Sequence, residues 1–475
     1  MEYLYGVSSM CPNDSSLQDF IEFLSIPSVS AQPAYCNDVY KCAKWLEERL
    51  RRVGLHTSIP KTLGYPVVVG KSQDWRSFKP TVLFYGHYDV QPPEPFEEWI
   101  SHPFEPVIRD GKVYARGSTD NKGQILAHIL GVHETLQSDG SLPCNVIFLI
   151  EGEEEIGSPH LPSFLEEYKE ELRADVIVIS DTGMVGEGIP TLSYSTRGVA
   201  ALEFVVHGPS HDLHSGMYGG AVVNPATVAA RLIASLHDVS WRITIPGFYD
   251  AVRDLEPWER EISFSVPDSA IIAQTGVSEL HGELGYTSGE RIGTRPTVEV
   301  NGIGAGYQSE GTKTVLPRKA FAKLTFRLVP DQNPDKILSL AETHLHAQCP
   351  RGVRLEIQIG HSSPAYFFNP NSTYGQVAQV ALQKTFGQKS VLTREGGSIP
   401  IVQNFKAVLG VDSLLLALAS PDCRAHSPNE NFSMENFRNG IRLNQVFLRE
   451  IAKLPFRGDV LQNDSGGAAG ISGIC

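Results

Sequence analysis

The chain has 475 residues and a formal net charge of −14, from 40 Lys and Arg against 54 Asp and Glu. Its length favours two or three domains, and its acidity disfavours nucleic acid and anionic membranes as partners because like charges repel. The composition, 41% hydrophobic and 20% charged residues, is typical of a globular protein, and the apolar runs are too short to span a bilayer.

The first part of the chain alternates helical and strand patterns. Apolar residues at three- and four-residue spacing predict helices over Leu17–Leu24, Val39–Val53, Gln124–Leu136 and Phe164–Leu172. Short, β-branched and almost wholly apolar runs predict buried strands over Thr81–Tyr85, Asn145–Ile150 and Asp175–Ile179. This alternation predicts an α/β fold, with a mixed, largely parallel sheet and helices on both faces.

The pattern changes after Gly198. Alternating residues predict strands over Val199–Val206 and Ala320–Leu328, and a helical pattern covers Pro225–Leu236. A long polar stretch from Trp241 to about Pro296 lies between them. We therefore expect an inserted α+β domain.

The strand–helix pattern returns near the C-terminus. It predicts a helix near Thr373–Thr385, a buried apolar run at Leu414–Leu418 and a last helix at Phe437–Ile451. Residues 464–473 are rich in Gly, Ala and Ser, which is typical of disorder. We predict a first domain in two parts, 1–198 and 363–456, interrupted by the inserted domain at 199–362 and followed by a flexible tail at 457–475.

The N-terminus and the cysteines bear on location. Met1–Tyr5 shows no basic region followed by an apolar stretch, so we expect no signal peptide. The seven cysteines contain no CxxC pair and form no recognisable disulfide framework, which favours a reducing compartment. The expected location is the cytoplasm.

Side chains suited to metal ligation follow the predicted strands. The set consists of His87, Asp89, Glu154, Glu155, Asp181 and His426, with Asp120 directly before a predicted helix. Because reactive groups gather at the carboxyl ends of parallel strands, we expect these side chains to meet. Two imidazoles with several carboxylates and no thiolate predict a two-metal hydrolytic site.

Each segment by itself has a simpler interpretation. A His-x-Asp pair is more often a loop histidine with a satisfied hydrogen bond, although Asp89 is on the correct side to hold His87 in one tautomer. Asp120 could be a helix N-cap, and a carboxylate can also bridge two ions. The run Glu151–Glu155 would usually be a solvated acidic face. Their joint placement at strand ends favours the metal site.

Taken together, these segments resemble the aminoacylase/carnosinase family of co-catalytic zinc metallopeptidases, and within it the cytosolic nonspecific dipeptidases, over about 17–454. The resemblance implies a zinc exopeptidase-like fold whose inserted domain is a lid and dimerisation domain. It implies two divalent ions per subunit, one held by His87, Asp120 and Asp181 and one by Asp120, Glu155 and His426. Glu154 would be the general base, and Asp89 would orient His87.

The resemblance also implies contacts with a peptide substrate. His214, in Asp212–Gly216, would reach the site of the partner subunit in a homodimer, although a surface histidine is the simpler interpretation. Thr314, Arg327, Gly397 and Ser398 would bind substrate. The planar fork of Arg327 suits a free carboxylate, while its simpler interpretation is a surface residue on an alternating strand.

The expected activity is hydrolysis of dipeptides or short peptides with a free C-terminal carboxylate. Zinc is the expected ion, and Mn²⁺ or Co²⁺ also suits oxygen-rich sites. An N-acyl-amino-acid deacylase is the alternative, disfavoured because relatives with that activity often carry glutamate in place of Asp181. A catalytically silent scaffold is the second alternative, disfavoured because all five ligands are present. Asn121 departs from the second aspartate of many relatives.

Overall fold

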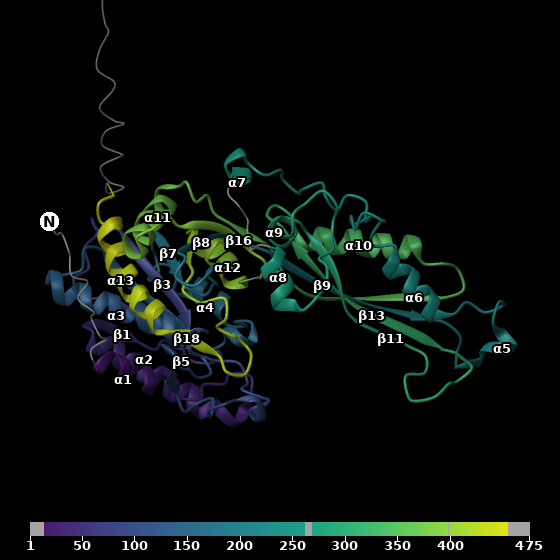
Figure 1. Ribbon diagram of the computed structural model, residues 1–475, viewed down its shortest axis with the longest axis horizontal. Helices are drawn as coiled ribbons and strands as arrows, with labels where there is room; N and C mark the ends of the chain where they lie inside the picture. The colour runs from purple at the N-terminus through teal and green to yellow at the C-terminus, as the bar shows by residue number, and fades with distance from the viewer. Residues whose placement is uncertain (1–13, 262–267, 398, 455–475) are drawn as a thin grey trace, which may run out of the picture. The chain divides into compact units, whose positions relative to one another are not determined.

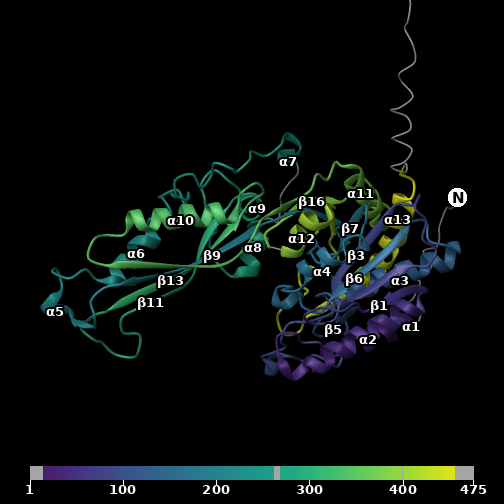
Figure 2. The same ribbon diagram turned by 180° about the vertical axis from the view of Figure 1, so that it is seen from behind.

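A computed structural model describes residues 14–261, 268–397 and 399–454 (Figures 1 and 2). The predicted tail at 457–475 and Ser398 lie outside the described residues. The chain divides into two compact units, the first formed by 1–193, 368–392 and 404–475 and the second by 194–367 and 393–403. The predicted inserted domain, 199–362, begins and ends five residues inside the main segment of the second unit. The short segment 393–403 was not predicted to join it.

The main sheet has the strand order β1-β2-β6-β3-β7-β17-β8, and the short strands β15 (Tyr366–Phe367) and β16 (Val391–Glu395) also pair with β8. The strands are β1 (Leu55–Ser58), β2 (Val68–Ser72), β3 (Thr81–His87), β6 (Asn145–Glu151), β7 (Val176–Ile179), β8 (Thr191–Thr196) and β17 (Ser413–Leu416). The four central strands β6, β3, β7 and β17 are parallel. The flanking strands pair antiparallel. The mixed sheet with a parallel centre confirms the predicted fold class.

Helices cover both faces of this sheet. They are α1 (Asp14–Leu24), α2 (Cys36–Arg52), α3 (Lys122–Asp139), α4 (Leu161–Glu167), α11 (Thr373–Phe386), α12 (Pro400–Leu409) and α13 (Met434–Ile451). Successive side chains of a strand point to opposite faces. Accordingly, the ring of Phe84 packs on His128 of α3, whereas the ring of Tyr85 packs on Phe405 of α12. Helix α13 lies against α3 (Figure 1).

One predicted helix is wrong at both ends. The pattern predicted Phe164–Leu172, but α4 starts at Leu161 and ends at Glu167. Pro162 stands in the first turn of α4. Backbone amides in a first turn have no acceptor within the helix, so the missing amide hydrogen of proline costs no hydrogen bond there. After Glu167 the chain turns, with the amide of Leu172 bonded to the carbonyl of Tyr168 at 3.0 Å.

A small second sheet of the first unit joins distant parts of the chain. Its order is β18-β5-β4, formed by β4 (Val107–Arg109), β5 (Lys112–Tyr114) and β18 (Asn431–Ser433). Asn431 pairs with Tyr114, so the segments directly after β5 and directly before β18 run side by side. These two segments carry Asp120 and His426.

The second unit is built on an antiparallel sheet with the order β11-β13-β9-β14. The strands are β9 (Gly198–His207), β11 (Thr297–Ala305), β13 (Lys319–Leu328) and β14 (Arg354–Ser363). Helices α6 (Pro225–Ala234) and α10 (Pro334–Gln348) pack on one face (Figure 1). The buried core between them includes Phe204, Leu232, Phe326 and Leu345.

Smaller elements complete the second unit. They are the strand pair β10 (Leu213–His214) and β12 (Val315–Leu316), and helices α5 (Ser215–Tyr218), α7 (Pro257–Glu261), α8 (Asp268–Thr275) and α9 (Ser288–Gly293). The helices among the described residues are all too short or too polar to cross a membrane.

Candidate metal centre

The predicted ligands lie at the carboxyl edge of the parallel strands. His87 is the last residue of β3 and is paired with Glu151, the last residue of β6. Glu154 and Glu155 follow in the short 3-10 helix η3 (Glu154–Ile156), and Asp181 stands two residues beyond β7. The three strands are parallel, so their last residues share one edge of the sheet.

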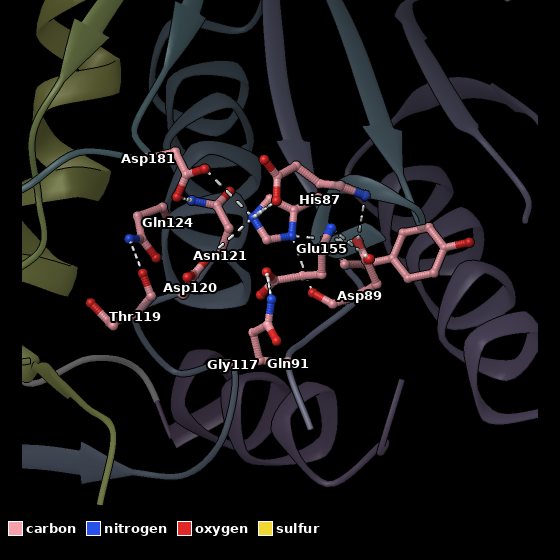
Figure 3. A network of polar contacts seen from close by, with 12 residues as sticks. His87, Asp89, Gln91, Gly117, Thr119, Asp120, Asn121, Gln124, Glu155 and Asp181 are labelled. Atoms are coloured by element: carbon pink, nitrogen blue, oxygen red, sulfur yellow. Dashed lines mark hydrogen bonds and ion pairs between the residues drawn. The ribbon is translucent and has the colours of Figure 1, made fainter. Parts of the chain in front are cut away.

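The first cluster of ligands is centred on His87. Its Nε2 lies 3.1 Å from Oδ1 of Asp120 and 3.5 Å from Oδ2 of Asp181 (Figure 3). These three side chains offer ligand atoms within 4.8 Å of one another, a spacing that could hold a metal ion. The imidazole is buried, so it is already shielded from competing water.

The second cluster shares Asp120 with the first. Nε2 of His426 lies 2.8 Å from Oδ2 of Asp120 and 3.5 Å from Oε2 of Glu155. The two oxygens of Asp120 therefore face different imidazoles, the geometry that a carboxylate bridging two ions requires. The structure thus brings together the same two ligand sets that the resemblance implied.

Two buried atoms at the centre fit a cation. Among the described residues, Oε1 of Glu155 is buried without a hydrogen-bond partner, and the buried Nε2 of His87 makes no well-aligned hydrogen bond to the carboxylates beside it. Leaving such atoms unpaired is costly, and a divalent ion would satisfy both. The donors are imidazole nitrogens and carboxylate oxygens, which suit Zn²⁺ and also harder ions such as Mn²⁺.

Asp89 has a wider structural role than the sequence predicted. Nδ1 of His87 lies 3.1 Å from the backbone oxygen of Asp89 and 3.4 Å from its carboxylate. The carboxylate also accepts from Ser30 Oγ at 2.6 Å and from the backbone amides of Glu154 and Glu155 at 3.2 and 3.1 Å. Asp89 therefore ties the strand that carries His87 to the turn that carries both glutamates.

Two amide side chains that sequence reasoning missed hold ligand carboxylates. Nδ2 of Asn121 donates to Oδ1 of Asp181 at 3.0 Å, leaving Oδ2 to face His87 (Figure 3). Nε2 of Gln91 donates to Oε2 of Glu155 at 2.7 Å. Such outer partners orient metal ligands. The sequence had marked Asn121 as a departure from the second aspartate of many relatives but had assigned it no role.

Protonation at the centre follows from its crowded charges. Burial and the neighbouring Asp120 raise the pKa of Glu155 to about 9. The hydrogen bond to Asp120 raises the pKa of His426 to about 9. Burial would raise the pKa of Asp120, but His426 and His87 hold it below its usual value. In the metal-free protein, protons therefore occupy positions that cations would take.

Glu154 stands apart from both ligand sets. Its Oε2 is 4.0 Å from Nε2 of His87, farther than Asp120 or Asp181. Burial, followed by the carboxylates of Asp181 and Asp120, raises its pKa to about 7, while His87 lowers it. A carboxylate with a pKa near neutrality is well matched to accept and return a proton.

Two predicted substrate residues lie at one end of the sheet of the second unit. Arg327 pairs with Val199 near the end of β13. Arg197, two residues before Val199, donates from its backbone amide to the carbonyl of Gly397 at 3.0 Å and from Nε to Gly396 at 2.8 Å. Burial and the charge of Arg327 lower the pKa of Arg197 to about 10. Sequence reasoning missed Arg197.

A cationic cavity of about 350 Å³ opens beside these residues. Its lining includes four arginines, Arg197, Arg291, Arg295 and Arg327, and two glutamates, Glu283 and Glu299, and Glu283 forms an ion pair with Arg295. The excess of arginines over glutamates favours an anionic group. The other two predicted substrate residues lie elsewhere: His214 pairs with Val315, and the amide of Ser215 donates to the carbonyl of Thr314 at 3.1 Å. His214 is exposed and its Nδ1 accepts from Gly216.

Known proteins of similar sequence and structure identify the family. Residues 83–450 match the model of Peptidase family M20/M25/M40. Cys-Gly metallodipeptidase DUG1 of Saccharomyces cerevisiae is 32% identical over 91% of this chain and 94% of its own length. Beta-Ala-His dipeptidase of Homo sapiens is 30% identical over 93% of this chain and 91% of its own.

A solved structure agrees. The M20 family metallo-carboxypeptidase Sso-CP2 from Sulfolobus solfataricus has a TM-score of 0.81 and 33% sequence identity, over 93% of this chain and all of that chain. These similarities confirm the resemblance to the carnosinase family that the sequence motifs indicated. The chain is a peptidase and belongs to the peptidase family M20/M25/M40.

Proposed function

We propose that this chain is a dinuclear metallopeptidase that hydrolyses dipeptides and short peptides with a free C-terminal carboxylate. The observation that carries the proposal is the shared carboxylate of Asp120, which faces His87 with one oxygen and His426 with the other. The names of the relatives, Cys-Gly metallodipeptidase and Beta-Ala-His dipeptidase, support a dipeptide as substrate. Zn²⁺ is the ion that we propose, with Mn²⁺ and Co²⁺ as substitutes.

The residues divide the chemical work among them. When bound, two divalent ions would lower the pKa of a water and polarise the scissile carbonyl. Glu154 accepts a proton from the attacking water and returns it to the leaving amine, for which its pKa near 7 is suited. Asp89 fixes the ring of His87 and, through two backbone amides, the turn that carries Glu154.

The substrate carboxylate would be held in the second unit. We assign it to Arg327, whose fork can bind both oxygens, with the backbone at Gly397 beside it. Arg197 supports this arrangement because it bonds the Gly396–Gly397 segment and lies close to Arg327. Ser398 completes the proposed set.

A homodimer would complete the site. His214 and Thr314 lie beyond the start of β13, and Arg327 lies near its other end. A strand of ten residues spans about 30 Å, whereas a dipeptide is roughly 7 Å long. One copy of this unit therefore cannot bring His214 and Thr314 to the same dipeptide as Arg327. We propose that His214 and Thr314 come from the partner subunit, where His214 would stabilise the oxyanion.

The edge of the second unit's sheet supports such an assembly. Strand β14 is an outer strand, and most of its residues are exposed. Ile359 on this strand is 53% exposed. An unpaired edge with apolar side chains is prone to pair with another chain. We therefore propose that this unit serves for dimerisation.

A reducing, cytoplasmic location is part of the proposal. The cysteines within the described residues, Cys36, Cys42, Cys144, Cys349 and Cys423, are all free thiols. Disulfides form and persist in oxidising compartments, so free thiols are consistent with a reducing one.

The test is a comparison of two substrate classes with the metal-loaded protein. Unmodified dipeptides should release free amino acids, and N-acetylated amino acids should not. Release from the acetylated compounds alone would identify a deacylase instead. Failure to bind a divalent ion, with no release from either class, would leave only a non-catalytic role.

A further inference from the structure

A buried carboxylate, Glu430, lies behind the shared ligand of the candidate centre. Its side chain is fully buried. Oε1 accepts from the backbone amides of Thr119 and Asp120 at 2.9 and 3.1 Å. Oε2 accepts from the amide of Gly117 at 2.9 Å and from Nη1 of Arg116 at 2.7 Å. Four donors therefore converge on one carboxylate.

The backbone of the Asp120 loop is shaped around this carboxylate. Gly117 has a φ of +84°, and a Cβ there would lie 2.6 Å from Val90, so glycine is required. In this conformation three amide groups of one turn point at a single anion, as in backbone nests. Without Glu430 these amides would be buried and unpaired, which no ordinary loop tolerates.

Glu430 also belongs to the loop that carries His426. It stands four residues after His426 and directly before β18. Its backbone oxygen accepts from the amide of Ala115 at 3.1 Å. Through its backbone and its side chain, Glu430 therefore joins the loop of Asp120 to the loop of His426. These two ligands form the shortest contact of the second cluster, at 2.8 Å.

An ordinary buried ion pair with Arg116 does not account for this geometry. Three of the four hydrogen bonds run to backbone amides, and one of these amides belongs to Asp120 itself. We propose that Glu430 is a positioning residue, which fixes the bridging carboxylate and thereby sets the affinity of both metal positions. The inference rests on the proposed dinuclear centre.

Loss of Glu430 and loss of Asn121 should affect the two metal positions differently. Asp120 contributes to both ligand sets, so a change at Glu430 should weaken both metal positions together. Asn121 bonds only Asp181 among the ligands, so its loss should weaken the position at His87 and spare the position at His426.

The experiment is a metal titration of the full chain. Metal-free wild type, Glu430→Gln and Asn121→Ala are titrated with Zn²⁺ against a chelating competitor, and two binding constants are fitted. Loss of a residue that orients a ligand typically reduces metal affinity roughly 10–100-fold. For Glu430→Gln we expect a loss of this size at both positions. For Asn121→Ala we expect it at one.

Glu259→Gln is the matched control. Glu259 is another fully buried carboxylate, bonded to Arg253 and Arg394 in the second unit and to none of the proposed ligands. Its substitution should cost stability but leave both binding constants unchanged. If Glu430 contributed to stability alone, Glu430→Gln would behave like this control. The melting temperature of the metal-free protein would fall, and both metal affinities would stay at the wild-type value.

Glu430→Asp decides the question if Glu430→Gln does not fold. The aspartate keeps the charge opposite Arg116. It is one methylene shorter, so it cannot reach Arg116 and all three backbone amides at once. We expect at least about tenfold weaker binding at both positions. Wild-type affinity in a folded Glu430→Gln or Glu430→Asp would overturn the inference. A wild-type protein that binds no pair of ions would instead refute the proposed function.

Discussion

The carboxylate of Asp120 lies 2.8 Å from Nε2 of His426, although the two residues come from the first and the last segment of the first unit. The chain between them contains the whole second unit. Formation of the proposed centre therefore requires these two segments of the first unit to dock. Any ion bound there would stabilise the docked state, because binding that is restricted to the folded protein adds to its stability.

Glu154 is the residue whose loss should separate metal binding from turnover. Glu154→Gln keeps the size of the side chain and removes its ability to accept a proton. Both metal-binding constants should stay near the wild-type value, while kcat falls roughly 10²–10⁴-fold, the usual contribution of a general base. Metal analysis and steady-state kinetics on a dipeptide measure the two effects. Wild-type kcat would remove Glu154 as the base.

Metal uptake should release protons. In the metal-free protein the pKa values of Glu155 and His426 are both raised to about 9, so at pH 7.5 this coupled pair holds protons that bound ions must displace. Apparent affinity should therefore rise as the pH increases from 7 to 9. We expect roughly one to two protons per chain, measured by calorimetry in buffers of different ionisation enthalpy. Proton release of zero at pH 7.5 would contradict this protonation scheme.

Arg327 should act on the substrate carboxylate. Arg327→Lys keeps the charge but loses the planar fork. We expect KM for a dipeptide to rise at least about tenfold, in line with the loss of a charge-assisted hydrogen bond. The dipeptide amide, which lacks the carboxylate, provides the control and should be cleaved equally slowly by both proteins. An unchanged KM for the free dipeptide would exclude this assignment.

His214 should act in the site of the partner subunit. A protein with His214→Ala and a protein with Glu154→Gln are each expected to be nearly inactive. In a mixture that exchanges subunits, the heterodimer contains one site with an intact Glu154 and an intact partner histidine. Activity should therefore rise well above that of either variant. The absence of any recovery, with exchange demonstrated by labelled subunits, would mean that the site is completed within one chain.

His128 should make stability depend on pH. It is fully buried and bonded through Nδ1 to Asn444 at 2.8 Å, and burial lowers its pKa from 6.5 to about 4. The unfolded chain therefore binds a proton before the folded chain does, and stability is lost as the pH falls from about 6.5 towards 4. At about 1.4 kcal/mol per pKa unit, the loss between pH 7 and 4.5 is roughly 2–3 kcal/mol.

The variant His128→Gln isolates this contribution. Glutamine can donate to Asn444 but does not titrate. Urea unfolding of the metal-free proteins at pH 7 and pH 4.5 should show that wild type loses roughly 2–3 kcal/mol more than the variant between the two conditions. Equal losses would mean that His128 is not neutral in the folded protein.

The sequence by itself determined the strands and the chemical nature of their ends. The runs that became β3, β6 and β7 are apolar throughout because both faces of the sheet are covered by helices. Ligands placed just beyond such runs meet, since parallel strands end at the same edge. Local pattern and this single topological rule were therefore enough to predict that these side chains meet, and the division of the ligands into two sets came from the family resemblance.

Only the tertiary structure decided which groups support those ligands. Glu430 reaches the Asp120 loop through the pairing of β18 with β5, and Arg197 reaches the distant segment at Gly397 from the position between β8 and β9. The short segment 393–403 joins the second unit although its pattern continues that of the first. These contacts are hydrogen bonds between residues far apart in the chain. A sequence pattern reports which face of an element is apolar, and it contains no information on which distant backbone groups will need a partner.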